Sequence, residues 1–147
     1  MYSILLIFHI VISILLGIIS CYIVLRSIFG LLGKVSFSNF YDIKLPIAAV
    51  ICLYLELILG LLLYAIYINQ LETLITQANA NAYFSARFWA VEHAILMFFA
   101  IIFGHLGLVY AKNLANDKQK FQKNCLYFGL SFILIVLSLS MNMMRNA

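Results

Sequence analysis

Residues 3–25, SILLIFHIVISILLGIISCYIVL, run for 23 positions without a charged side chain. About 20 apolar residues are enough for an α-helix to cross the hydrocarbon core of a bilayer. Three further stretches share this character: residues 45–71 with one charge, Glu56, residues 88–111 with one, Glu92, and residues 124–144 with none. Backbone groups in lipid must be hydrogen-bonded within their own segment, so each stretch is predicted to be a transmembrane helix.

The composition of the whole chain agrees with this prediction. Of the 147 residues, 66% are hydrophobic and 10% are charged, whereas about a quarter are charged in a soluble domain. A chain this small cannot bury so much apolar surface by itself. The composition therefore excludes a soluble globular enzyme, a disordered chain and a nucleic-acid-binding module. We predict a single all-α domain over residues 1–147, an integral membrane four-helix up-down bundle in a lipid bilayer, because its connections are short.

The basic residues predict the orientation of this bundle. Seven of the nine lie in the connections after the first and third spans, and these are Arg26, Lys34, Lys44, Lys112, Lys118, Lys120 and Lys123. The positive-inside rule places these connections in the cytoplasm, and both termini outside or in the periplasm. No basic segment precedes residues 3–25 and no cleavage site of small residues follows them, which predicts a retained span and not a signal peptide. The expected location is the inner membrane of a bacterium, with multiple passes.

Two histidines are predicted to lie at one depth of this bundle. His9 is six residues into the first span and His93 is five residues into the third, and these spans run in the same direction. At a rise of ~1.5 Å per residue, both imidazoles lie roughly 8–10 Å below the outer boundary. Imidazole is a common axial ligand of haem, and bundle cores hold such cofactors. His9 and His93 are therefore candidate metal ligands of one haem b.

Neighbouring residues fit a flat cofactor in the same place. Helical spacing puts Ser13 on the face of His9, and Met97, Ala100 and Gly104 on the face of His93, and most of these side chains are small. Arg87 precedes His93 by about one and a half turns, where its guanidinium is expected to pair with haem propionates. The competing interpretation is structural. Intramembrane histidines also hydrogen-bond neighbouring helices, and small residues also serve close helix packing.

A second polar level is predicted deeper in the membrane. His105 lies ~18 Å beyond His93 along the same helix and cannot bind the same iron. Counted from the cytoplasmic ends of their spans, Glu56 and His105 approach each other and could form a proton-exchanging or quinone site. A structural hydrogen bond between the two helices is the alternative. Cys21, Cys52 and Cys125 have no CxxC spacing and are expected to be small buried hydrophobes.

The chain also resembles a known family, the small four-helix membrane proteins called cytochrome B in Bacteroidetes. The resemblance covers nearly the whole chain and is carried by His9 and by residues 25–34 (LRSIFGLLGK), Phe37, 42–45 (DIKL), 59–64 (LGLLLY) and 87–93 (RFWAVEH). Residues 10–11 lack the Ser and Arg-Trp that follow the histidine in that family. The resemblance implies a b-type cytochrome.

These observations predict a membrane cytochrome that transfers electrons through one bis-histidine haem, with quinol as a candidate donor or acceptor. No catalytic residue is predicted, and an electron-transfer protein is favoured over a stand-alone enzyme. A redox partner protein or a larger membrane complex is expected as its partner. Two other functions stay open: a cofactor-free accessory subunit of a larger membrane complex, and a small proton-coupled transporter that uses Glu56 and His105.

Overall fold

Four long helices make up most of the chain. The computed structural model describes residues 2–77 and 91–145, with the elements α1 (Tyr2–Leu31), the π-helical turn η1 (Phe40–Lys44), α2 (Leu45–Gln77), α4 (His93–Asn113) and α5 (Asp117–Arg145). Each of the four α-helices contains a segment long and apolar enough to cross a membrane. The all-α prediction with four such helices is confirmed, and the chain is a multi-pass membrane protein by this criterion.

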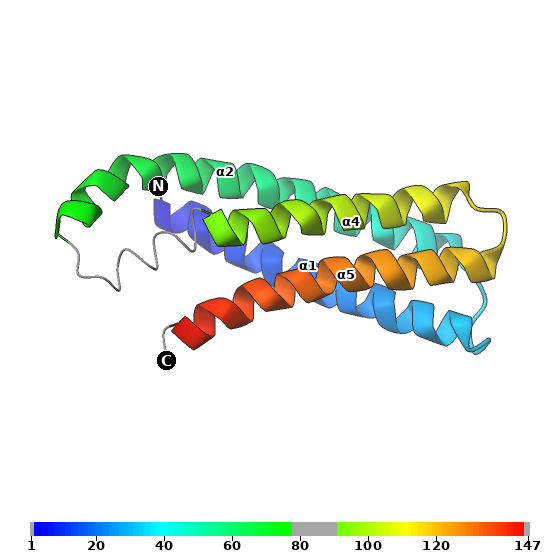
Figure 1. The fold of residues 1–147 in the computed structure, drawn as a ribbon. Helices are drawn as coiled ribbons and strands as arrows, with labels where there is room; N and C mark the ends of the chain where they lie inside the picture. Colours follow the sequence, from blue (N-terminus) through cyan, green and yellow to red (C-terminus); the bar gives the residue numbers. More distant parts are fainter. Residues whose placement is uncertain (1, 78–90, 146–147) are drawn as a thin grey trace.

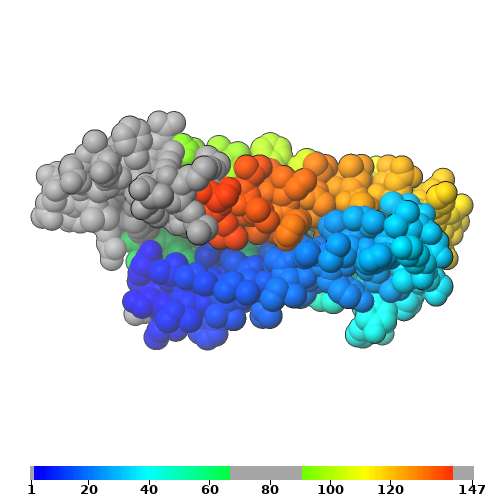
Figure 2. All heavy atoms as spheres, turned by 90° about the horizontal axis from the view of Figure 1, so that it is seen from below, coloured from blue at the N-terminus to red at the C-terminus, as the bar shows by residue number. Residues whose placement is uncertain are grey.

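The helices form an up-down bundle in which chain neighbours are antiparallel (Figure 1). α1 packs on α2 and α5, and α4 packs on the same two helices. Figure 2 shows α1 and α5 running side by side over one face of the molecule. α1 and α4 therefore lie diagonally opposite each other and run in the same direction. Side chains from these two helices can meet only at the centre of the bundle.

The helices extend past the uncharged stretches from which the spans were predicted. α1 continues from residue 25 to Leu31, and α5 begins at Asp117, seven residues before the predicted span. Both extensions carry charged residues that lie at the end of the bundle where α1 and α4 finish. The predicted third span begins at residue 88, which lies outside the described residues.

Local chemistry explains where two of the helices end and begin. Gly33 has a φ of 70°, and the Lys34 and Gly33 N–H groups donate to the carbonyls of Phe29 and Gly30 at 3.0 and 3.1 Å. This is a Schellman motif, and its left-handed residue favours glycine. At the start of α5 the Asn116 side chain accepts a hydrogen bond from the Lys118 N–H at 2.9 Å, as an N-cap residue does.

An ion pair joins three elements at this end of the bundle. Arg26 in α1 donates to both carboxylate oxygens of Asp42 in η1, at 2.9 and 3.0 Å. The same carboxylate accepts the Ser38 N–H at 2.7 Å, and the Asp42 carbonyl accepts the side-chain amide of Asn124 in α5 at 3.2 Å. Asp42 is 2% exposed. These bonds fix α1, η1 and α5 at one level, and we refer to Arg26, Asp42 and Asn124 as the Asp42 clamp.

Glycines on α4 set the spacing of the helices in the same half of the bundle. A Cβ atom on Gly107 would lie 2.9 Å from the ring of Phe128, and one on Gly104 would lie 2.6 Å from Leu53. Both neighbours are buried in the core, with Phe128 0% and Leu53 2% exposed. Small residues allow transmembrane helices to approach closely, and here they bring α4 against α5 and α2.

This packing predicts that the same substitution changes the free energy of unfolding by different amounts at two glycines. Gly107→Ala should lower the free energy of unfolding by about 1–3 kcal/mol, because the buried Phe128 ring cannot move aside. Gly129→Ala is the matched control, since nothing lies within 4 Å of its Cβ position, and it should be neutral or slightly stabilising. Unfolding in mixed detergent micelles measures both, and equal effects would contradict the packing described.

Candidate functional site

The imidazoles of His9 and His93 meet at the centre of the bundle. Their ring centroids lie 6.2 Å apart, and the ring planes are inclined at 77°. His9 comes from α1 and His93 from the start of α4, the two helices that are diagonal in the bundle. The expectation that these histidines lie at one depth agrees with this geometry.

His9 is held by a carboxylate from α2. Its Nδ1 forms an ion pair with Oε2 of Glu56, and the two side chains are 16% and 10% exposed. His9 Nδ1 and the second carboxylate oxygen, Oε1, are both buried and make no hydrogen bond within the described part of the chain, so Glu56 meets His9 through a close charge contact and not through a hydrogen bond.

His93 is held in a similar way by a hydroxyl group from α5. Its Nδ1 lies 2.7 Å from Oγ of Ser138, which is 3% exposed. Each imidazole therefore has an Nδ1 contact with a buried polar group from one of the two remaining helices. Metal-binding histidines in proteins have this arrangement, in which the second ring nitrogen contacts a carboxylate, a carbonyl or another polar group.

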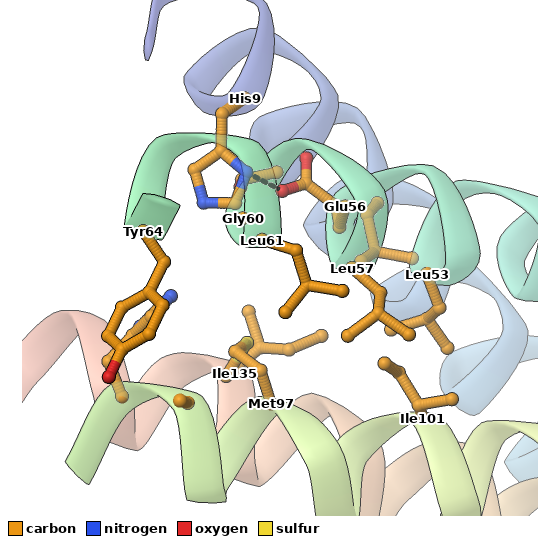
Figure 3. Close-up of a pocket in the computed structure, with 14 residues that line it drawn as sticks. His9, Leu53, Glu56, Leu57, Gly60, Leu61, Tyr64, Met97, Ile101 and Ile135 are labelled. Atoms are coloured by element: carbon orange, nitrogen blue, oxygen red, sulfur yellow. Dashed lines mark ion pairs between the residues drawn. The ribbon is translucent and has the colours of Figure 1, made fainter. Parts of the chain in front are cut away.

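Two cavities adjoin the pair of imidazoles. The larger, of about 350 Å³, is lined by both histidines, by Glu56 and by mostly apolar side chains. Figure 3 shows His9 and Glu56 joined at one wall of this cavity, with Leu53, Leu57, Leu61, Met97, Ile101 and Ile135 around the space. The smaller, of about 250 Å³, reaches toward the start of α1 and includes Tyr2 and Leu6. His9, His93, Gly60 and Tyr64 line both cavities.

Only some of the predicted neighbours line this space. Ser13 and Met97 line the larger cavity, as expected for residues that face a cofactor. Ala100 and Gly104 do not. Ala100 is 0% exposed and its carbonyl accepts the Ser131 hydroxyl at 2.9 Å, while Gly104 packs against Leu53. The small-residue stripe on α4 therefore serves helix packing at these two positions.

The expected pairing of Glu56 with His105 does not occur. Glu56 reaches His9, and His105 Nδ1 lies 3.1 Å from the hydroxyl of Tyr54, on a different side of α2. Tyr54 and Glu56 are two residues apart, so their side chains leave the helix about 200° apart. Arg87, the predicted partner of haem propionates, lies outside the described residues.

Three residues of the site were not predicted from the sequence. Ser138 is one of them, although its spacing carried a signal: Ser131 and Ser138 are seven residues apart on an apolar helix and so share one face. Gly60 and Tyr64 are the others. A Cβ on Gly60 would lie 3.9 Å from Cε1 of His9, so this glycine leaves room beside the ring.

The described residues contain no group of three or more His, Cys, Asp or Glu side chains placed to hold a metal ion. A non-haem metal site requires about three or four protein ligands, whereas a haem requires two axial ones. Comparisons of this chain with protein-family models, with curated proteins and with solved structures found no match. The resemblance to the cytochrome B proteins therefore stays a prediction.

The contact of Ser138 with His93 predicts a specific loss of stability. Ser138→Ala should lower the free energy of unfolding by about 1–3 kcal/mol, because it removes a buried partner of the imidazole. Ser140→Ala is the matched control on the same helix, since its hydroxyl donates to the Leu137 carbonyl, an acceptor in its own helix. An effect as small for Ser138 as for Ser140 would show that the hydroxyl does not hold His93.

Proposed function

We propose that this chain is a membrane cytochrome that binds one haem b between His9 and His93 and transfers single electrons. The observation that carries the proposal is the meeting of two half-buried imidazoles from diagonal helices beside two cavities. A haem supplies a one-electron couple at its iron, with a potential that depends on the axial ligands and on the surroundings.

His9 and His93 are the residues that would hold the haem. Their rings come from opposite helices, with centroids 6.2 Å apart and planes inclined at 77°, and both line the same two cavities.

The two cavities also fit a flat group centred between the histidines. Gly60 and Tyr64, which line both cavities together with the histidines, would border such a group. The larger cavity lies toward the middle of the bundle and has apolar walls, and the smaller one lies toward the start of α1, where Tyr2 and Tyr64 line it.

The polar side chains that contact His9 and His93 would orient the two imidazoles toward the haem. Glu56 Oε2 contacts Nδ1 of His9, and Ser138 Oγ lies 2.7 Å from Nδ1 of His93, so each ring is oriented by a polar group from a neighbouring helix. A carboxylate on Nδ1 raises the basicity of the ligand and is expected to lower the reduction potential. Leucine and isoleucine side chains make up much of the wall of the larger cavity.

The setting proposed for this protein is the inner membrane of a bacterium, with both termini outside. The basic residues support this orientation, because seven of nine lie at the end of the bundle opposite the histidines or in the adjoining connections. The cofactor would then lie in the outer half of the membrane. The partner expected there is a redox protein or a larger respiratory complex.

Absorption spectra of the purified protein test the proposal directly. After expression with an adequate haem supply, the reduced-minus-oxidised spectrum should show the α-band of a low-spin b haem. His9→Ala and His93→Ala should each abolish that band, because each removes an axial ligand. His105→Ala is the matched control, since it removes an imidazole from α4 that contacts Tyr54 instead, and it should leave the band unchanged.

Two results would contradict the proposal. A protein that is helical and monodisperse but carries no haem would favour an accessory subunit without a cofactor. A low-spin band that survives loss of His93 would show that the axial ligands are other residues.

A further inference from the structure

A second polar pair lies away from the cavities, on the outward-facing side of α2 and α4. The hydroxyl of Tyr54 lies 3.1 Å from Nδ1 of His105, and the two rings are in edge-to-face contact at 6.2 Å. Tyr54 is 41% exposed, and His105 is exposed as well. In a membrane-embedded bundle this surface faces lipid chains.

Such a position is costly for an imidazole and a phenol. Tyr54 is nine residues from the start of α2 and His105 is eight from the end of α4, which places both about 12–14 Å along their helices. The hydrocarbon core is about 30 Å thick, so this depth is near its middle and offers no water. By contrast, Ser27, Ser131 and Asn124 are buried and bond to backbone carbonyls inside the bundle.

The pair retains hydrogen-bonding capacity after the groups bond each other. An imidazole has a second ring nitrogen, and a phenol oxygen can both donate and accept. In hydrocarbon, an unsatisfied polar group costs several kcal/mol. A ligand for this place therefore needs a polar head that can donate or accept, and an apolar body that tolerates lipid.

The surrounding side chains favour a small amphiphile over a further helix. Large aliphatic residues flank the pair, with Ile51, Leu55 and Ile58 on α2 and Ile102 and Val109 on α4 all facing outward. The nearby small residues of α4, Gly104, Gly107 and Ala111, are buried and face the bundle. Transmembrane helices associate through small residues, and this surface offers none on α4.

We infer that the Tyr54–His105 pair binds the ring of a lipid-soluble quinone or quinol. The carbonyl oxygens of a quinone accept hydrogen bonds and the hydroxyls of a quinol donate them, and the pair can meet either form. The quinone ring can pack against the rings of Tyr54 and His105, and the apolar tail can pack against the aliphatic side chains around them. Binding at this site does not require haem.

Tyr54 of this pair lies near Glu56, although His105 is ~18 Å beyond His93 along α4. Tyr54 precedes Glu56 by two residues, about 3 Å along α2. Glu56 faces the larger cavity on one side of the helix, and Tyr54 faces outward on another. If the chain is a cytochrome, the quinone site is placed to exchange electrons with it across a single helix.

Photolabelling in proteoliposomes tests this inference. The purified full-length chain is illuminated with an azido-substituted quinone that carries an apolar tail, and the labelled residues are mapped by mass spectrometry. Label is expected near residues 51–58 and 102–109, and an excess of decyl-quinone should displace it. Tyr54→Phe and His105→Leu should each lower the labelling yield about tenfold, because each removes a hydrogen bond to the ring.

Controls separate this site from the proposed haem site and from misfolding. Tyr22→Phe removes the hydroxyl of another exposed tyrosine, on α1, and should label like the natural sequence. His9→Ala should also label normally, whether or not it has lost haem, so failure of the cytochrome proposal leaves this result intact. Circular dichroism checks that each variant is helical.

Three outcomes would overturn the inference: labelling that decyl-quinone does not displace, equal labelling of the Tyr54 and His105 variants and the natural sequence, or label confined to the cavity residues. A change of oligomeric state in these two variants, measured by light scattering, would assign the pair to a protein contact instead.

Discussion

A polar side chain on a helix this apolar has to find its partner within the protein, because hydrocarbon supplies none. This constraint accounts for much of the structure. It turns the Ser131 hydroxyl to a carbonyl of α4, and the buried Asn124 to the Asp42 carbonyl of η1. The same requirement brings Glu56 and Ser138 to the two central histidines. Polar contacts between helices therefore stabilise both the fold and the candidate site.

The Asp42 clamp also sets the level at which the site forms. Glu56 lies 14 residues after Asp42 on one helix, and Ser138 lies 14 residues after Asn124 on another. Both distances correspond to about 21 Å of helix. Because the clamp holds η1 and α5 at the same height, the carboxylate and the hydroxyl arrive at one height as well. The imidazoles that they hold are 6.2 Å apart across the bundle.

The sequence predicted the four helices and the shared depth of His9 and His93, because length, apolarity and the constant rise of a helix determine both. It did not predict the neighbours of Ala100, Gly104 and Glu56. Helical periodicity shows which residues share a face, but not which helix that face meets. Glu56 was matched with His105 by counting from the ends of uncharged stretches. The helices run past those ends, and Asp42 and Arg26 give the true reference level.

The contrast between the two halves of the bundle is an argument for a ligand at the histidines. Where α4 carries Gly104 and Gly107, the helices are in close contact and a single added methyl group would collide with Leu53 or Phe128. Toward the start of α1 and α4 the same helices border cavities of about 350 and 250 Å³. Protein interiors are normally close-packed, and a cavity forfeits dispersion contacts. Larger apolar side chains at Gly60 and Ser13 would fill part of this space, so the open half with its converging imidazoles is where the proposed ligand would fit.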